Sequence, residues 1–115
     1  MASTKKKPMG YHYVVYLNGV HYTHWDGKND SEMMRAIASY FTSTGRQYHK
    51  GPEGLKLQIE KYPYYDRVEQ FGESDKYFIM HVKPTMVWGV GSAKWWSVNK
   101  SGKKGAVHTI NITND

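Results

Sequence analysis

The sequence predicts one α+β domain, an antiparallel sheet of about five to six strands with one main helix packed on a face. Three observations predict it: an Asn-Gly turn between two β-rich runs, one amphipathic helical run, and a series of extended runs after it, in the order ββαββββ. The 115 residues are the length of a single domain. We expect residues 10–115 to form it, behind a flexible basic arm over residues 1–9.

The first pair of strands is predicted by Asn18-Gly19, which separates the runs 11–17 and 20–25. Asn-Gly tolerates the positive φ angles of a type I′ turn, so a two-residue hairpin is expected. An uninterrupted register places Tyr16 opposite His21 and His12 opposite Trp25. The better core face of this hairpin then holds Tyr13, Val15, Leu17, Val20, Tyr22 and His24. The other face holds His12, Val14, Tyr16, His21, Thr23 and Trp25.

The helix is predicted over residues 30–44. Asn29 and Glu32 have the spacing of a capping box, and Gly45 is a typical helix stop. Its apolar stripe, which we expect to cover the sheet, consists of Met33, Met34, Ile37, Ala38 and Phe41.

Further strands are predicted after a polar loop. Leu55, Leu57 and Ile59 alternate with polar residues, as in a half-buried strand, and the run is expected to break at Tyr62-Pro63. Residues 64–74 are expected to form a loop or short helix. The remaining extended runs are 76–83, then 85–90 and 93–98, which join near Gly91-Ser92, and finally 106–113.

Composition excludes several classes of protein. The chain has no Cys, which excludes disulfides and thiolate metal sites. No run is long enough to span a membrane, and no apolar segment follows the first lysines, so we expect a cytoplasmic protein without a membrane partner. No sequence motif indicates a cofactor or a metal ion.

The charge is polarised along the chain, although its sum is only +6. Residues 1–25 carry three lysines and no acid, residues 26–75 carry seven bases and nine acids, and residues 76–114 carry six lysines and no acid. Basic ends around a slightly acidic middle favour an anionic partner.

The C-terminal third combines this charge with aromatic residues. Lysine interleaved with tryptophan suits single-stranded nucleic acid, because phosphates need cations and unstacked bases need flat apolar surfaces. Trp95 and Trp96 point to opposite faces of a strand, and we expect Trp95 in the core and Trp96 beside Lys94. The Gly-flanked pair Lys103-Lys104 is expected on an exposed, mobile loop. The candidate nucleic-acid-binding residues are Trp88, Lys94, Trp96, Lys100, Lys103 and Lys104, with Lys5, Lys6 and Lys7 in the arm. The alternative is that the rings are core residues and the lysines ordinary surface charges.

Six histidines form a second group. His21-Tyr22-Thr23 resembles the His-x-Thr element of the two-histidine phosphoesterases, and the expected register places His21, Thr23 and His12 on one face. Those enzymes have a second His-x-Thr, which this chain does not have, so these three are only secondary catalytic candidates. A metal-dependent nuclease would use His21, His24 and Asp26, but alternation puts His21 and Asp26 on opposite faces. No metal site is therefore expected.

The function that the sequence favours is non-enzymatic nucleic-acid binding through a lysine loop and exposed aromatic rings. DNA, RNA, single strands and double strands all stay open. The first alternative is a small inhibitor of viral or phage type that binds a host protein, since exposed Tyr and Trp are also typical of protein interfaces. The second is a histidine-dependent phosphodiesterase or nuclease.

Overall fold

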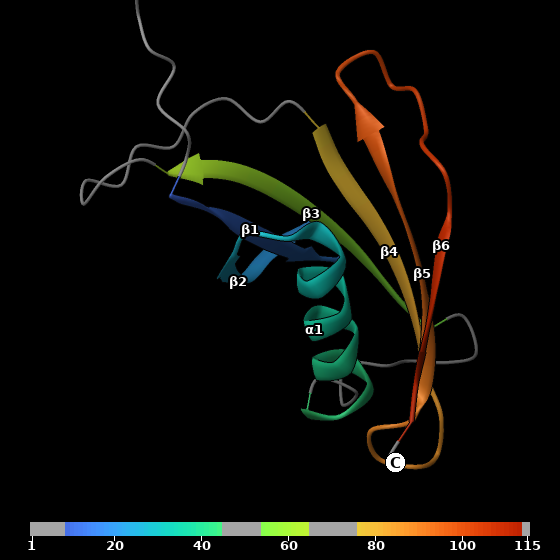
Figure 1. The fold of residues 1–115 in the computed structure, drawn as a ribbon. Coiled ribbons are helices and arrows are strands. Elements are labelled where there is room, and N and C mark those ends of the chain that lie inside the picture. The colour runs from blue at the N-terminus through green and yellow to red at the C-terminus, as the bar shows by residue number, and fades with distance from the viewer. Residues whose placement is uncertain (1–8, 45–53, 65–75, 114–115) are drawn as a thin grey trace, which may run out of the picture.

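The computed structural model describes residues 9–44, 54–64 and 76–113. It has the expected α+β architecture: one helix packs on a six-stranded antiparallel sheet (Figure 1). The strands lie side by side in the order β2-β1-β3-β4-β5-β6. The elements in chain order are β1 (Gly10–Leu17), β2 (Val20–Gly27), α1 (Asp30–Thr42), β3 (Leu55–Tyr64), β4 (Lys76–Pro84), β5 (Gly91–Asn99) and β6 (His108–Ile112).

The β1–β2 hairpin has the predicted turn but not the predicted register. Asn18 and Gly19 have φ angles of 53° and 81°, as a type I′ turn requires. Tyr16 pairs with His21 as expected, but the next pair is Val15 with Thr23, so Tyr22 is an extra residue in a β-bulge.

The bulge corrects the faces assigned to β2. Beyond it, Trp25 is opposite the buried Tyr13, and His24 is opposite Val14. The prediction that His24 faces the core and Trp25 faces away is therefore wrong. Trp25 packs on the helix side, with its ring centroid 5.5 Å from that of Tyr40.

Helix α1 begins and packs as its sequence predicts. The Asn29 side chain accepts a hydrogen bond of 3.1 Å from the backbone N–H of Glu32, which caps the N-terminus. The buried residues of the helix are Met34, Ile37, Ala38, Phe41 and Thr42. Within residues 9–44, 54–64 and 76–113, no helix has the length and hydropathy of a membrane span.

The end of β3 differs from its prediction. Strand β3 does not break at Tyr62-Pro63 but continues to Tyr64, pairing with β1 through Tyr11 and Pro63. Its pairing with β4 runs only from Leu55 to Glu60, so Pro63 lies where the described part of β3 has a partner on one side only, a position that tolerates proline.

The predicted strand at 85–90 is instead the turn between β4 and β5. The hydroxyl of Thr85 donates to the carbonyl of Val90 at 2.9 Å, and the backbone N–H of Gly89 donates to the carbonyl of Thr42 at the end of α1. Gly89 has a φ angle of 76°, a conformation that an extended strand does not contain.

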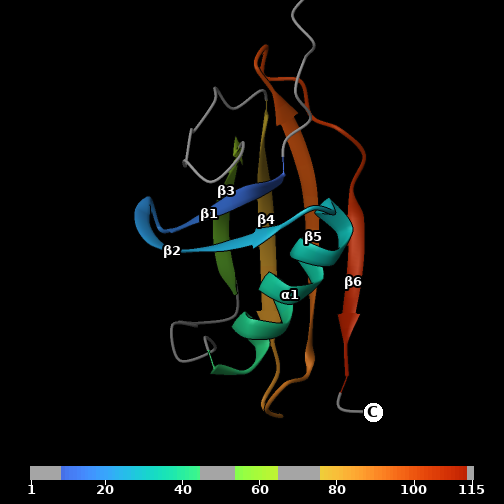
Figure 2. The ribbon, with the colours of Figure 1, turned by 60° about the vertical axis from the view of Figure 1, so that its left-hand side comes forward.

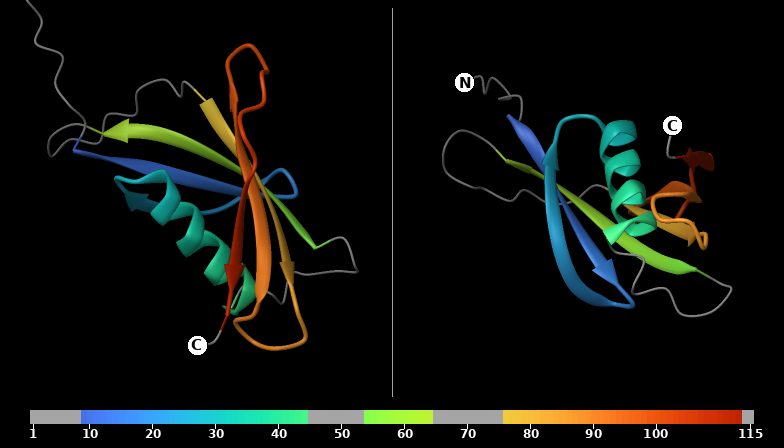
Figure 3. Two further views of the ribbon diagram at one scale, coloured as in Figure 1. Left: turned by 45° about the vertical axis from the view of Figure 1, so that its right-hand side comes forward. Right: turned by 90° about the horizontal axis from the view of Figure 1, so that it is seen from below.

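The two faces of the sheet have different surroundings (Figures 2 and 3). Helix α1 packs against β2, β4, β5 and β6 on one face. The buried strand residues on this face are Tyr13, Val15, Leu55, Leu57, Ile59, Phe78, Met80, Val82, Ala93, Trp95, Ile110 and Ile112. No described helix covers the other face, which we call the open face.

The bulge generates a test of the fold. Trp25→Ala should lower the free energy of unfolding by at least about 2 kcal/mol, because the ring packs against the helix. His24→Ala should change it by less than about 0.5 kcal/mol, as for other exposed residues. Urea denaturation of both variants, without added metal, measures the difference. An uninterrupted register would reverse the order of the two effects.

Candidate nucleic-acid interface

The open face is built by alternate residues of the strands. The cross-strand pairs Gln58–Ile79 and Ile79–Trp96 run across β3, β4 and β5, and the next row is Lys56–His81–Lys94. The full set on β1, β3, β4 and β5 is His12, Val14, Tyr16, Lys56, Gln58, Glu60, Tyr62, Tyr77, Ile79, His81, Lys83, Ser92, Lys94, Trp96 and Val98.

Trp96 is the centre of the basic part of this face. Its half-buried ring lies 5.1 Å from that of His81 between ring centroids, at an interplanar angle of 78°. The Nζ of Lys104 lies 4.4 Å from the centroid of Trp96, which is a cation–π distance. Lys104 reaches this position because it forms a β-bridge with Val98, a residue on the same face as Trp96. We call Trp96, His81, Lys56, Lys83, Lys94 and Lys104 the Trp96 cluster.

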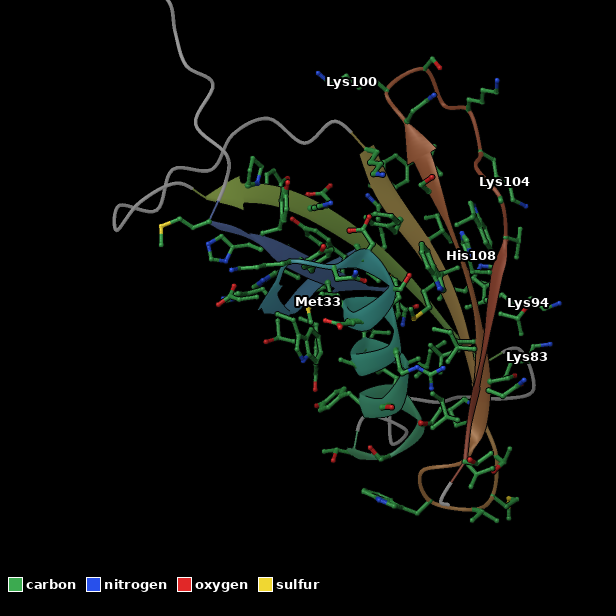
Figure 4. The ribbon with its side chains drawn as sticks, in the orientation of Figure 1. Met33, Lys83, Lys94, Lys100, Lys104 and His108 are labelled. Carbon is green, nitrogen blue, oxygen red and sulfur yellow. The ribbon has the colours of Figure 1, made fainter. Side chains whose placement is uncertain are left out.

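The charge around Trp96 has one sign. Lys83, Lys94 and Lys104 point away from α1 (Figure 4), and residues 76–113 contain no Asp or Glu. The nearest acid along β3 is Glu60, which accepts a hydrogen bond of 2.5 Å from the hydroxyl of Tyr62. This bond, with burial and the Glu60 charge, raises the pKa of Tyr62 to about 12.

A groove leads away from the cluster toward the β1–β2 turn. It has a volume of about 390 Å³. Its lining comes from β1, β3, β4 and the turn: Tyr16, Asn18, Gly19, Lys56, Leu57, Gln58, Ile79 and His81. His81 and Lys56 therefore belong to both the groove and the Trp96 cluster.

The surroundings of His81 favour its neutral form. Burial lowers the pKa of the imidazole below its usual 6.5, and the positive charges of Lys56, Lys104 and Lys83 lower it further. A neutral His81 offers both a hydrogen-bond donor and an acceptor within a basic surface.

The structure brings together only some of the predicted binding residues. Lys94 and Trp96 share a face of β5 and Trp95 is in the core with 7% of its surface exposed, as expected. Lys104, which was expected on a mobile loop, lies over the Trp96 ring instead. Trp88 is exposed, but it lies in the β4–β5 turn, whereas the lysine loop is at the other end of β5. The nine residues of β5 place this turn about 30 Å from the lysine loop. Lys5, Lys6 and Lys7 lie outside the described residues.

The lysine loop between β5 and β6 is exposed, and its backbone is tied to Asn99. The Oδ1 of Asn99 accepts hydrogen bonds from the backbone N–H groups of Ser101 at 3.0 Å and Lys103 at 2.9 Å. The backbone N–H of Asn99 in turn donates to the carbonyl of Lys103 at 3.1 Å. Lys100 and Lys103 lie on this loop, whereas the side chain of Lys104 lies over the Trp96 ring.

Sequence reasoning did not assign Lys56, Lys83 and His81 to the site. Their places on the polar sides of the runs 55–59 and 76–83 are visible in the sequence as alternation. Alternation does not predict that β3 and β4 are neighbours or that Lys56 pairs with His81. That information requires the strand order.

The histidines are rearranged by the bulge. Thr23 is opposite Val15 on the helix side, and His21 and His12 lie at opposite ends of the hairpin, so the three secondary catalytic candidates do not form one site. Instead His12, His24 and Asp26 meet on the open side of the hairpin. Their potential ligand atoms lie within 4.8 Å of one another.

No protein-family model, curated protein or solved structure matches the chain.

The His81 environment generates a prediction about pH. In a histidine NMR titration, the midpoint of His81 should lie below 6.5, and Lys104→Ala should move it upward by removing a nearby positive charge. The folded chain then binds fewer protons at His81 than the unfolded chain does. Its stabilising contribution is therefore complete above pH 6.5 and is lost as the pH falls from 6.5 through the folded-state pKa. A midpoint above 6.5 would contradict the proposed surroundings.

Proposed function

We propose that the chain is a non-enzymatic binder of single-stranded nucleic acid, which contacts the open face at the Trp96 cluster. The observation that carries the proposal is the position of Trp96 between His81 and Lys104, all three of them in residues 76–113, a segment that has lysines and no carboxylate. A base needs a flat apolar surface and a phosphate needs a cation within a few ångströms of it, and this arrangement offers both.

The geometry favours a single strand over a duplex. An indole ring on a sheet can stack only on a base that is already unstacked from its neighbours. Lys94 lies two residues before Trp96 on β5, and Lys104 is bridged to Val98, two residues after it, so lysines on both sides of Trp96 can follow a phosphate backbone. The groove that contains His81 and Lys56 is a second position for a nucleotide on this path.

Fluorescence anisotropy with labelled single- and double-stranded DNA and RNA tests the proposal. Single strands should bind more tightly, and affinity should fall steeply with salt because bound lysines release counterions. Trp96→Ala should weaken single-strand binding roughly five- to a hundredfold, the range of one lost stacking contact. Lys104→Ala should lower the slope of log Kobs against log salt by about one.

Two matched variants control for composition and charge. Trp88→Ala removes an exposed tryptophan outside the Trp96 cluster, and Lys28→Ala removes an exposed lysine between β2 and α1. Both should leave affinity within a factor of about two, and circular dichroism should show that all four variants are folded. If Trp96→Ala and Trp88→Ala reduced the affinity for nucleic acid equally, the Trp96 cluster would not be the binding site.

A protein partner is the second candidate, and a different observation favours it. The β4–β5 turn exposes three consecutive apolar residues: Met86, Val87 and Trp88 are 95%, 56% and 54% exposed. Apolar and aromatic side chains at an exposed turn are typical of protein interfaces. In this case Trp88→Ala, and not Trp96→Ala, should abolish binding to the partner, and no nucleic acid should bind at low salt.

A further inference from the structure

Three side chains with metal-binding atoms meet at the β1–β2 hairpin. His12 on β1 and Asp26 on β2 are cross-strand partners, and His24 precedes Asp26 by two residues on the same side of β2. The Nδ1 of His12 contacts the Oδ1 of Asp26, and the Nε2 of His24 lies 3.8 Å from the same oxygen. The two imidazole rings are 5.5 Å apart between centroids, at 79° to each other.

This donor set selects among metal ions. Mg²⁺ and Ca²⁺ are held mainly by oxygen, whereas two imidazole nitrogens and one carboxylate oxygen suit zinc and the neighbouring divalent transition metals. Around a tetrahedral zinc ion, donor atoms lie about 3.3 Å apart. The distances in the cluster, all within 4.8 Å, require only small side-chain shifts to reach this value.

The burial of the three residues favours such a shift. The His12 side chain is 8% exposed and is held in the sheet, whereas the Asp26 and His24 side chains are 54% and 53% exposed and have room to adjust. The site thus has one fixed ligand and two adjustable ones. The two exposed ligands both belong to β2, the first strand in the order of the sheet. A fourth coordination position is left for water or another small ligand.

We propose that His12, His24 and Asp26 bind one divalent transition-metal ion of the zinc class. If this group served only to hydrogen-bond β1 to β2, His12 and Asp26 would be sufficient and His24 would not be needed. The third, His24, has the position of a ligand because the β-bulge turns it to the same side as His12. The proposal does not depend on nucleic-acid binding, since the cluster belongs to β1 and β2 and the Trp96 cluster to β3, β4, β5 and the β5–β6 loop.

The test uses the full-length chain without an affinity tag, treated with a chelator and desalted. Co²⁺ is added while visible absorption is recorded, and Zn²⁺ binding is measured by calorimetry. We expect one ion per chain, a Co²⁺ spectrum typical of four-coordinate nitrogen and oxygen ligands, and an increase in Tm with Zn²⁺ but not with Mg²⁺.

Variants of the two exposed ligands make the test specific. His24→Ala and Asp26→Asn should each weaken Zn²⁺ binding at least tenfold. Removing a residue that only orients a metal ligand already weakens binding tenfold or more, and loss of the ligand itself should cost at least as much. His21→Ala and His108→Ala remove exposed histidines outside the cluster and should bind Zn²⁺ like the unmodified chain. Absence of Zn²⁺ binding, equal binding of Mg²⁺, or Zn²⁺ binding unaffected by both ligand variants would overturn the proposal.

Discussion

The arrangement of the molecule depends on the β-bulge at Tyr22. One additional residue in β2 reverses the side to which every later residue of that strand points. Trp25 consequently packs on Tyr40 of the helix, and His24 and Asp26 join His12 on the opposite side. The bulge residue Tyr22 itself contacts the helix, with its ring centroid 5.6 Å from that of Phe41. A single backbone irregularity thus completes the helix–sheet interface and assembles the polar cluster.

The first turn of the helix is attached to the sheet by one carboxylate. Asp30 accepts a hydrogen bond of 2.7 Å from the hydroxyl of the buried Tyr13, and its Oδ1 lies 2.9 Å from the Nζ of Lys61. Burial and the Asp30 hydrogen bond raise the pKa of Tyr13. Asp30 therefore has its partners on the helix side of the sheet, and α1 covers only that side. Lys83, Lys94 and Lys104 instead point away from the helix, in a segment, residues 76–113, that contains no Asp or Glu.

Local patterns predicted most of the fold and only part of the candidate site. The Asn18-Gly19 turn and the Asn29 cap are decided by residues close in sequence, and both predictions are confirmed. The choice of Trp95 for the core is also confirmed, because alternation with Lys94 decides it. The bulge, the extension of β3 through Pro63 and the turn at 85–90 depend on partner strands and on the helix end, which short-range patterns do not contain. For the same reason the sequence indicated Trp96 and Lys104 but not their neighbours His81 and Lys56.

If the chain binds nucleic acid as proposed, Asn99 affects the kinetics and entropy of that association. Its side chain and backbone hold the loop that carries Lys103, and this loop leads Lys104 onto Trp96 before any ligand arrives. A lysine on an unconstrained loop loses backbone and side-chain freedom when it meets an anion, and that loss opposes binding. Here part of the ordering is already complete in the unbound chain. The encounter with an anion can then proceed without a slow folding step of the loop, at a rate set mainly by diffusion and long-range electrostatic attraction.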